Sequence, residues 1–233
     1  MSNQVSRNVQ SKVSRNVQSA IGSVKLARPR RRAAKGDGLL LRREILDAAS
    51  ELLAETRSED DVSIRAVAER VGVSTPAIYI HFHDKESMIM AVCMEVFDEL
   101  DHRLEVASSG VDDPVEILRR QGIAYVRFAL ERPEHYRIVF MRRFATPLTE
   151  HYDIDPVSTN VFQRLLATVH QCQDLGIFPP GDGVPIVLAL WSITHGLASL
   201  LITKPYLPWP DVEEFADLIF KMARLGISVF TPE

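Results

Sequence analysis

The chain has 233 residues, of which 46% are hydrophobic and 25% are charged, and it contains two cysteines. These proportions are those of an ordinary globular protein. They exclude a disulfide-stapled secreted scaffold, and the longest apolar run, 184–202, is broken by polar residues too often for a typical membrane span. We therefore expect a cytoplasmic protein with no secretory signal and no membrane partner.

The formal net charge of −4 conceals an uneven distribution. Residues 1–36 contain nine Lys or Arg and no Asp or Glu, whereas the rest of the chain has 18 basic and 31 acidic residues. A basic arm on an acidic body indicates that the arm alone seeks a polyanion. We expect this arm to be disordered or ordered only on DNA; the alternative is a solvated tail that aids solubility.

An amphipathic helix is predicted from Gly38 to about Glu55, and two short helices joined by a tight turn are predicted between Ser63 and Lys85. The first short helix has one apolar face, formed by Ile64, Val67, Ala68 and Val71. Gly72 suits a helix end in the left-handed conformation, and Pro76 suits the first turn of the next helix, 77–82. Asp84 can cap a third helix. This layout is that of a helix-turn-helix, whose second helix enters the major groove of DNA.

The rest of the chain reads as further helices without strand-like alternation. Apolar residues at helical spacing predict them at about 85–107, 115–131, 133–143, 156–175, 184–203 and 211–228. The helix at 184–203 is apolar around much of its circumference, so it should be buried on two sides. The fold class is therefore all-α, with about nine helices.

The helix-turn-helix region resembles the DNA-binding domain of the TetR family of bacterial transcriptional regulators. The matching residues are Ser63 and Arg65, the Ala-x-x-Val-Gly-Val-Ser run at 68–74, and the Ile-Tyr-x-His-Phe-x-x-Lys-Glu run at 78–86. More loosely, Trp191 and the following His195-Gly196 resemble an element in the ligand-binding domain of one subgroup of this family. The resemblance implies an effector pocket enclosed by the C-terminal helices and a homodimer interface made by the last two.

The DNA contacts that the resemblance implies fall on positions that match the family pattern. Thr75, Pro76 and Ala77 would lie in the major groove, where Thr75 can hydrogen-bond a base edge and the other two can touch a thymine methyl. Arg65 is placed to reach phosphate or guanine, and phosphates would be held by Tyr79, His81 and Lys85. The recognition helix has no Arg, Asn or Gln for a bidentate base contact, so specificity should depend on Arg65, apolar contacts and DNA shape.

Aromatic residues and one histidine of the C-terminal half are candidates for the pocket: Phe128, Tyr136, Phe140, Phe162, Trp191 and His195. Each of them can instead belong to the core. His195 in particular can be a core histidine bonded to a neighbour, a pocket residue, or a catalytic or metal-binding group. No nucleophile–base arrangement or metal-spaced cluster appears in the sequence, so we expect no enzymatic activity, no cofactor and no metal.

The sequence thus predicts three parts: a basic arm (1–36), a helix-turn-helix domain (37–84) and a helical domain for effector binding and dimerisation (85–233). The predicted function is a dimeric repressor that occupies a double-stranded DNA operator and is released by a small apolar or amphipathic effector. The alternatives are a ligand-independent or activating regulator and, least favoured, an all-α enzyme with His195 as its base.

Overall fold

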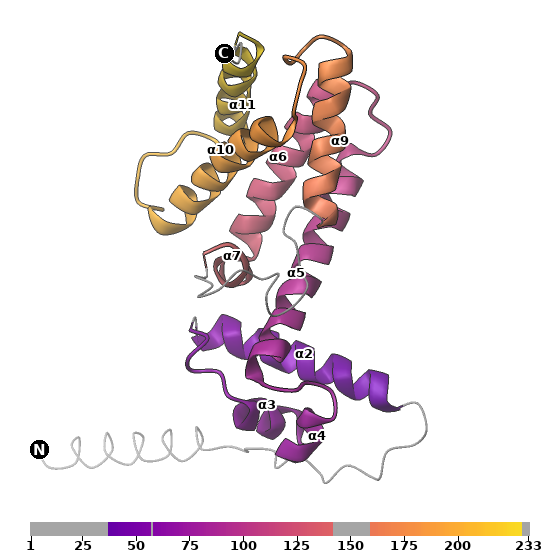
Figure 1. The fold of residues 1–233 in the computed structure, drawn as a ribbon. Coiled ribbons are helices and arrows are strands. Elements are labelled where there is room, and N and C mark those ends of the chain that lie inside the picture. Colours follow the sequence, from indigo (N-terminus) through magenta and orange to yellow (C-terminus); the bar gives the residue numbers. More distant parts are fainter. Residues whose placement is uncertain (1–36, 57, 142–158, 230–233) are drawn as a thin grey trace, which may run out of the picture.

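The computed structural model describes residues 37–56, 58–141 and 159–229, and these residues form nine helices and no strands (Figure 1). The predicted all-α class is confirmed. The predicted basic arm lies outside the described residues. The helices are α2 (Asp37–Thr56), α3 (Ile64–Val71), α4 (Thr75–Tyr79), α5 (Lys85–Ser108), α6 (Pro114–Glu131), α7 (Pro133–Phe140), α9 (Asn160–Asp174), α10 (Val184–Thr203) and α11 (Val212–Ser228).

The helices α2, α3 and α4 form one end of the molecule (Figure 1). The long helix α5 starts at this end and runs beside α6 to the opposite end. Helix α6 contacts α5, α7, α9, α10 and α11, so it is the central helix of the C-terminal half. The short helix α7 lies between the two ends and contacts both α2 and α5.

Local sequence signals set the ends of the helix-turn-helix. The Ser63 hydroxyl caps α3 by accepting a hydrogen bond from the Ala66 amide at 3.1 Å. Gly72 ends α3 with a φ of 78°, a conformation that glycine adopts without steric cost. The Asp84 carboxylate caps α5 by accepting from the Ser87 amide at 2.7 Å, and the Ser87 hydroxyl completes a capping box. The predicted roles of Gly72 and Asp84 are confirmed.

The recognition helix begins and ends earlier than predicted. It spans Thr75–Tyr79 instead of 77–82, because Ser74 is extended and Pro76 already belongs to the first helical turn. Ile80 and His81 form a turn, and the Phe82 ring is buried in the core. Thr75 is therefore the first residue of the helix, and Ser74 precedes it at the cap position.

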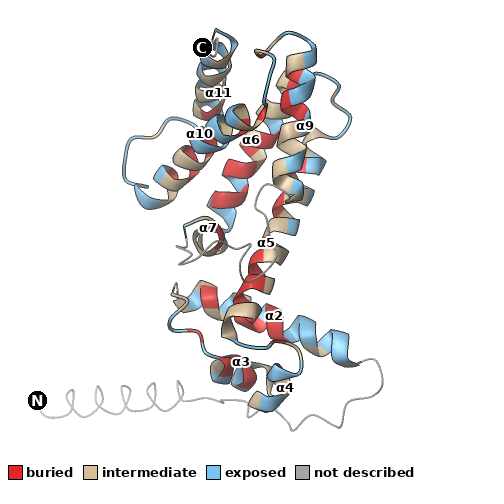
Figure 2. Cartoon of the chain, viewed as in Figure 1, coloured by how far each residue is buried: buried red, intermediate tan, exposed pale blue. Residues whose placement is uncertain are grey.

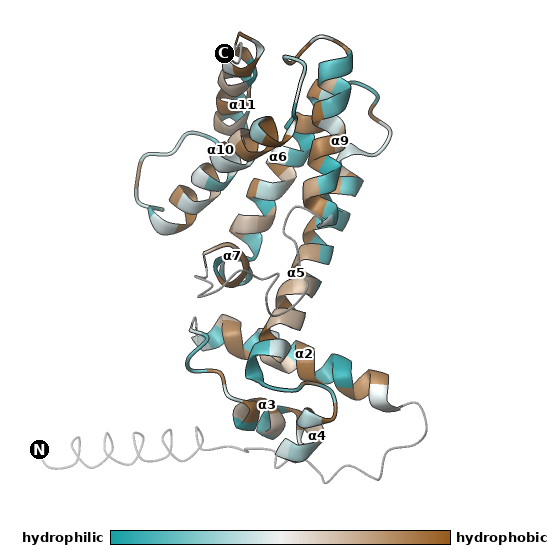
Figure 3. Ribbon diagram, in the orientation of Figure 1, coloured by the Kyte–Doolittle hydropathy of each residue, from teal (hydrophilic) through white to brown (hydrophobic). Residues whose placement is uncertain are grey.

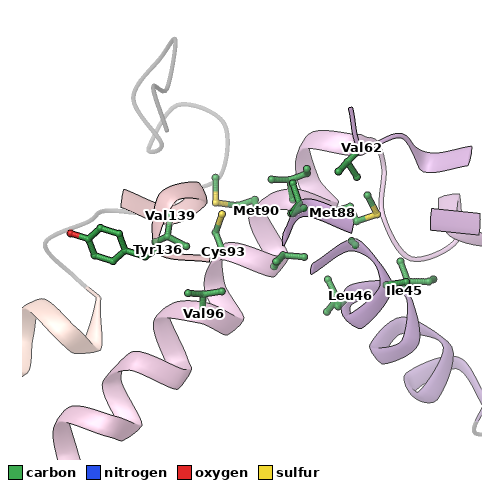
Figure 4. Close-up of a cluster of buried hydrophobic side chains, with 14 of the residues drawn as sticks. Ile45, Leu46, Val62, Met88, Met90, Cys93, Val96, Tyr136 and Val139 are labelled. Carbon is green, nitrogen blue, oxygen red and sulfur yellow. The ribbon is translucent and has the colours of Figure 1, made fainter. Parts of the chain in front are cut away.

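One hydrophobic cluster runs through the interior from α2 to α7. It contains Ile45 and Leu46 from α2, Met88 and Cys93 from α5, and Tyr136 from α7, as Figure 4 shows. Buried residues continue along α5 and α6 into the C-terminal half (Figure 2). The helix-turn-helix is thus packed onto the C-terminal half through a continuous core, which gives the two ends a direct mechanical connection.

Helix α10 is the most apolar helix of the described residues (Figure 3). It is the one helix among them that is long and apolar enough to cross a membrane by length and composition, a test that the core helix of a soluble protein also passes. One face of α10 packs against α6, α9 and α11. The other face includes the exposed Leu188 and Leu200 and the half-buried Gly196, whereas Ala198 is buried inside the subunit.

Candidate DNA-binding surface and effector cavity

Helix α4 presents a solvent-exposed face at the end of the molecule. The Ile78 side chain is fully buried and fixes the helix on the core, whereas Pro76 and Tyr79 are exposed. Thr75, Ala77 and His81 are half-buried. Five of the six positions predicted from Thr75 to Lys85 lie on α4 or in the turn that follows it, whereas Lys85 is the first residue of α5. Ile80, which is 80% exposed, adds an apolar group beside α4.

The two predicted basic contacts are placed differently. Arg65 on α3 has 83% of its side chain exposed, and its Nε donates to the Glu69 carboxylate at 2.9 Å. The Lys85 Nζ donates to the main-chain carbonyl of Glu59 at 2.6 Å, which ties the start of α5 to the loop before α3. A lysine ammonium has three hydrogens, so two remain for other acceptors. Both assignments to DNA stay predictions.

A cavity of about 120 Å³ lies in the C-terminal half, where α6 meets α5, α9, α10 and α11. Most of its wall is apolar, formed by Leu104, Val115, Leu118, Val161, Leu165, Phe178, Leu190 and Phe220. Trp191 and Tyr125 close one side. Gly122 is required for this shape, because a Cβ there would lie 2.5 Å from the Phe220 ring. A concave, mostly apolar site with few polar groups is the usual form of a small-molecule site.

A hydrogen-bonded aromatic network adjoins the cavity. The Tyr136 hydroxyl lies 2.6 Å from His195 Nδ1, and the Tyr125 hydroxyl lies 3.5 Å from that of Tyr136. Trp191 Nε1 donates to the Tyr125 hydroxyl at 3.3 Å. Burial raises the pKa of Tyr125 to about 12 and also raises the pKa of Tyr136, so both hydroxyls stay protonated. The network connects α6, α7 and α10.

Four of the six predicted pocket residues lie together, and the other two lie elsewhere. Tyr136, Phe140, Trp191 and His195 lie together, with ring centroids 5.1 Å apart for Tyr136 and Phe140 and 5.8 Å apart for Trp191 and His195. Of the six, Trp191 alone is among the residues that line the cavity. Phe128 is fully buried beneath Arg103, and Phe162 packs in a separate cluster with residues of α9 and α10. Their assignment as effector contacts stays a prediction.

Sequence reasoning did not single out Tyr125 or Gly122. Both lie with Leu118 on one face of α6, at spacings of three and four residues. That periodicity alone indicated a buried face. It did not reveal that the face borders a cavity, because most of the other walls come from α9, α10 and α11, which are distant in sequence.

The pKa of His195 predicts a pH-dependent stability. Burial lowers this pKa, so the unfolded chain binds the proton more tightly than the folded chain. The free energy of unfolding should therefore fall as the pH drops from about 7 to about 5, through the usual histidine range. The fall should be smaller in a His195→Gln variant. Burial also lowers the pKa of His135, so part of the pH-dependent loss of stability should remain in that variant.

Chemical denaturation across this pH range measures the effect. His83→Gln is the matched control, because the His83 side chain is 94% exposed. An equal loss of stability in the wild type and in His195→Gln would contradict the prediction.

The exposed face of α4 and the architecture around the cavity define a class: a helix-turn-helix protein with a helical C-terminal domain that contains an apolar cavity. Comparison with known proteins agrees. Residues 45–92 match the family model described as bacterial regulatory proteins of the tetR family, and residues 118–223 match the one described as a tetracyclin repressor-like C-terminal domain. The chain belongs to the TetR family of transcriptional regulators.

Individual relatives cover different parts of the chain. The transcriptional activator FasR of Mycolicibacterium smegmatis is 30% identical over 105 residues, which are 45% of this chain and 48% of FasR. The transcriptional repressor KstR2 of Rhodococcus jostii is 35% identical over 72 residues, which are 30% of this chain and 35% of KstR2. The chain thus spans half or less of the curated relatives it matches.

A solved structure shares the fold over most of the chain. A TetR family transcription regulator from Marinobacter aquaeolei superposes with a TM-score of 0.62 at 24% identity, covering 80% of this chain and 95% of that one. At this identity the likeness shows the fold.

Proposed function

We propose that this protein is a cytoplasmic, dimeric DNA-binding regulator that leaves its operator when a small apolar or amphipathic ligand enters the α6 cavity. The observation that carries the proposal is the direct packing between the two ends. A cavity walled by α5, α6 and α10 adjoins a network that reaches α7, and α7 contacts α2 of the helix-turn-helix. A ligand that changes these contacts changes the position of α4.

The link between α7 and α2 has a specific polar contact. The Ser50 hydroxyl on α2 lies 2.6 Å from His135 Nε2 on α7. The next residue along α7, Tyr136, bonds to His195 on α10 at a similar distance. Two adjacent residues of one short helix thus hold the DNA-binding end and the ligand-binding end, which supports coupling between them.

Dimerisation is supported by an exposed apolar surface on the last two helices. Leu218, Met222 and Leu225 on α11 are exposed, and so are Leu188 and Leu200 on α10. A Cβ at Gly196 on α10 would meet no atom within 4 Å, which leaves room for a close helix contact. A two-fold dimer would place its recognition helices about 34–36 Å apart, one turn of DNA.

Electrophoretic mobility shift with the DNA upstream of its own gene tests the proposal. We expect a shift at low salt and its loss when a cavity ligand is added. A shift that no compound in a broad screen abolishes would favour a ligand-independent regulator. A ligand that strengthens the shift would favour the activator, a role that the name of FasR carries for that relative. No shift at low salt would reject DNA binding and would favour the alternative that the protein is an enzyme.

Lys85→Ala is expected to weaken binding to all DNA sequences alike and to reduce the slope of log affinity against log salt by about 1, because one phosphate contact is lost. The substitution also removes the Lys85 bond to the Glu59 carbonyl, so a control measurement is needed. The thermal stability of the variant must be compared, so that loss of this bond is separated from loss of the phosphate. A weaker complex with an unchanged salt slope would reject the phosphate contact.

A further inference from the structure

Two cations line the cavity without an ion pair to any described residue: Lys221 and Arg224 of α11. Arg224 is exceptional in this respect. The other arginines that the structure describes between residues 85 and 229 all form ion pairs, namely Arg103, Arg119, Arg120, Arg127, Arg132, Arg137 and Arg164. Arg224 thus stands at the wall of an apolar cavity with no acidic partner in the part of the chain that the structure describes, although the body of the protein is acidic.

The remaining charges of this region neutralise one another. The Arg119 guanidinium bonds to Glu116 at 2.7 Å and to Asp217 at 2.8 Å. Arg120 also bonds to Glu116, at 2.8 Å. Two cations and two carboxylates thus form a closed group. Asp217, the one acidic residue among those that line the cavity, is held by Arg119, so the charge facing the cavity is positive.

The two cations lie on the cavity face of α11, away from the proposed dimer surface. Asp217, Phe220, Lys221 and Arg224 all line the cavity, at spacings of three, four and seven residues. The exposed apolar side chains of α11 lie on a different face, at Leu218, Met222 and Leu225. Lys221 is exposed and Arg224 is half-buried, so the positive charge lies where the cavity meets solvent.

We infer that the effector is an anionic amphiphile, with an apolar chain inside the cavity and a carboxylate or phosphate held by Lys221 and Arg224. This inference rests on the proposed ligand-binding role of the cavity. A guanidinium and an ammonium donate charge-assisted hydrogen bonds to either anion. A neutral apolar molecule would gain the same burial and none of these bonds.

The chain offers its own reporter for a binding test. It contains two tryptophans, and Trp191 lines the cavity, whereas Trp209 packs against Phe215 and bonds to the Lys204 carbonyl. In the full-length Trp209→Phe protein, fluorescence therefore reports on Trp191 alone. The probes are dodecanoate, dodecyl phosphate and dodecan-1-ol, which share one chain and differ in the head group, each added as monomer.

We expect at least one of the two anions to bind about tenfold more tightly than the alcohol, as two partly exposed charge contacts allow. Which anion is preferred distinguishes a carboxylate effector from a phosphate effector. A Lys221→Gln/Arg224→Gln variant should lose the preference and keep its affinity for the alcohol. Lys204→Gln is the matched control, because Lys204 is a lysine outside the cavity lining.

Two results would overturn the inference alone: alcohol binding as tight as anion binding, or a preference that persists in the double variant. Both would leave the cavity as a ligand site. If no probe changed Trp191 fluorescence and none was retained by the protein in equilibrium dialysis, the ligand-binding role of the cavity would be rejected together with the inference.

Discussion

Replacement of Tyr136 by Ala is expected to lower the free energy of unfolding by about 3–5 kcal/mol, the range for truncating a large buried aromatic side chain. Tyr136 is fully buried, and its ring packs 5.1 Å from the Phe140 ring and 5.5 Å from the His195 ring. The truncation also leaves His195 Nδ1 without the hydroxyl that lies 2.6 Å from it. Urea denaturation followed by circular dichroism measures the change.

Two further variants separate the causes. Tyr136→Phe keeps the ring and removes the hydroxyl, so it should cost about 1–3 kcal/mol. Tyr206→Ala removes the same side chain from a position that is 75% exposed and should change stability by less than about 0.5 kcal/mol. Equal effects of Tyr136→Ala and Tyr206→Ala would contradict the packing described for α7.

A Thr75→Ala/Tyr79→Ala double variant is expected to bind operator DNA about tenfold to a hundredfold more weakly, because it would lose the base contact predicted for Thr75 and the phosphate contact predicted for Tyr79. The Tyr79 side chain is 53% exposed and Thr75 is half-buried, so the fold should keep its stability. Fluorescence anisotropy with labelled operator measures the affinity.

The single variants divide the effect between specificity and general affinity. Thr75→Ala should weaken binding to the operator more than to unrelated DNA, since a base contact depends on sequence. Tyr79→Phe should weaken both alike, since only a phosphate partner is lost. Wild-type affinity in the double variant would show that α4 is not the reading helix.

The sequence predicted the elements whose causes are local. Gly72 ends α3 and Asp84 caps α5 as expected, because each acts through the backbone of its own neighbours. The spacing of Ile64, Val67 and Ala68 likewise identified the buried face of α3. The bounds of α4 were displaced by two to three residues, because a helix of five residues is held mainly by the burial of Ile78 and hardly by its own propensity.

The surroundings of the candidate pocket residues could not be predicted in the same way. Aromatic residues at helical spacing fill a core or line a cavity with the same pattern, so Phe128 and Trp191 were indistinguishable in the sequence. Their difference arises from tertiary packing: Phe128 lies beneath Arg103, whereas Trp191 borders the space that Gly122 leaves open. That Arg224 has no acidic partner among the described residues also became visible only after the ion pairs of the other described arginines were located.

The predicted boundary near residue 84 separates a DNA-binding part from an effector-binding part, and this boundary stays a prediction. The core itself does not stop there. Met88, Cys93 and Val96 of α5 lie in the same cluster as Ile45 of α2 and Tyr136 of α7 (Figure 4). The shared core crosses this functional boundary and so connects the two sites physically, which allows them to communicate.

The most direct test of the account is the affinity for operator DNA measured with and without a ligand that occupies the α6 cavity. Anisotropy of labelled upstream DNA would be recorded with the full-length protein, alone and with the tightest of the three probes at saturation. The account predicts an operator dissociation constant at least about tenfold higher with the probe, a coupling of the usual size for allosteric proteins. An unchanged dissociation constant, while Trp191 fluorescence shows the cavity occupied, would contradict it.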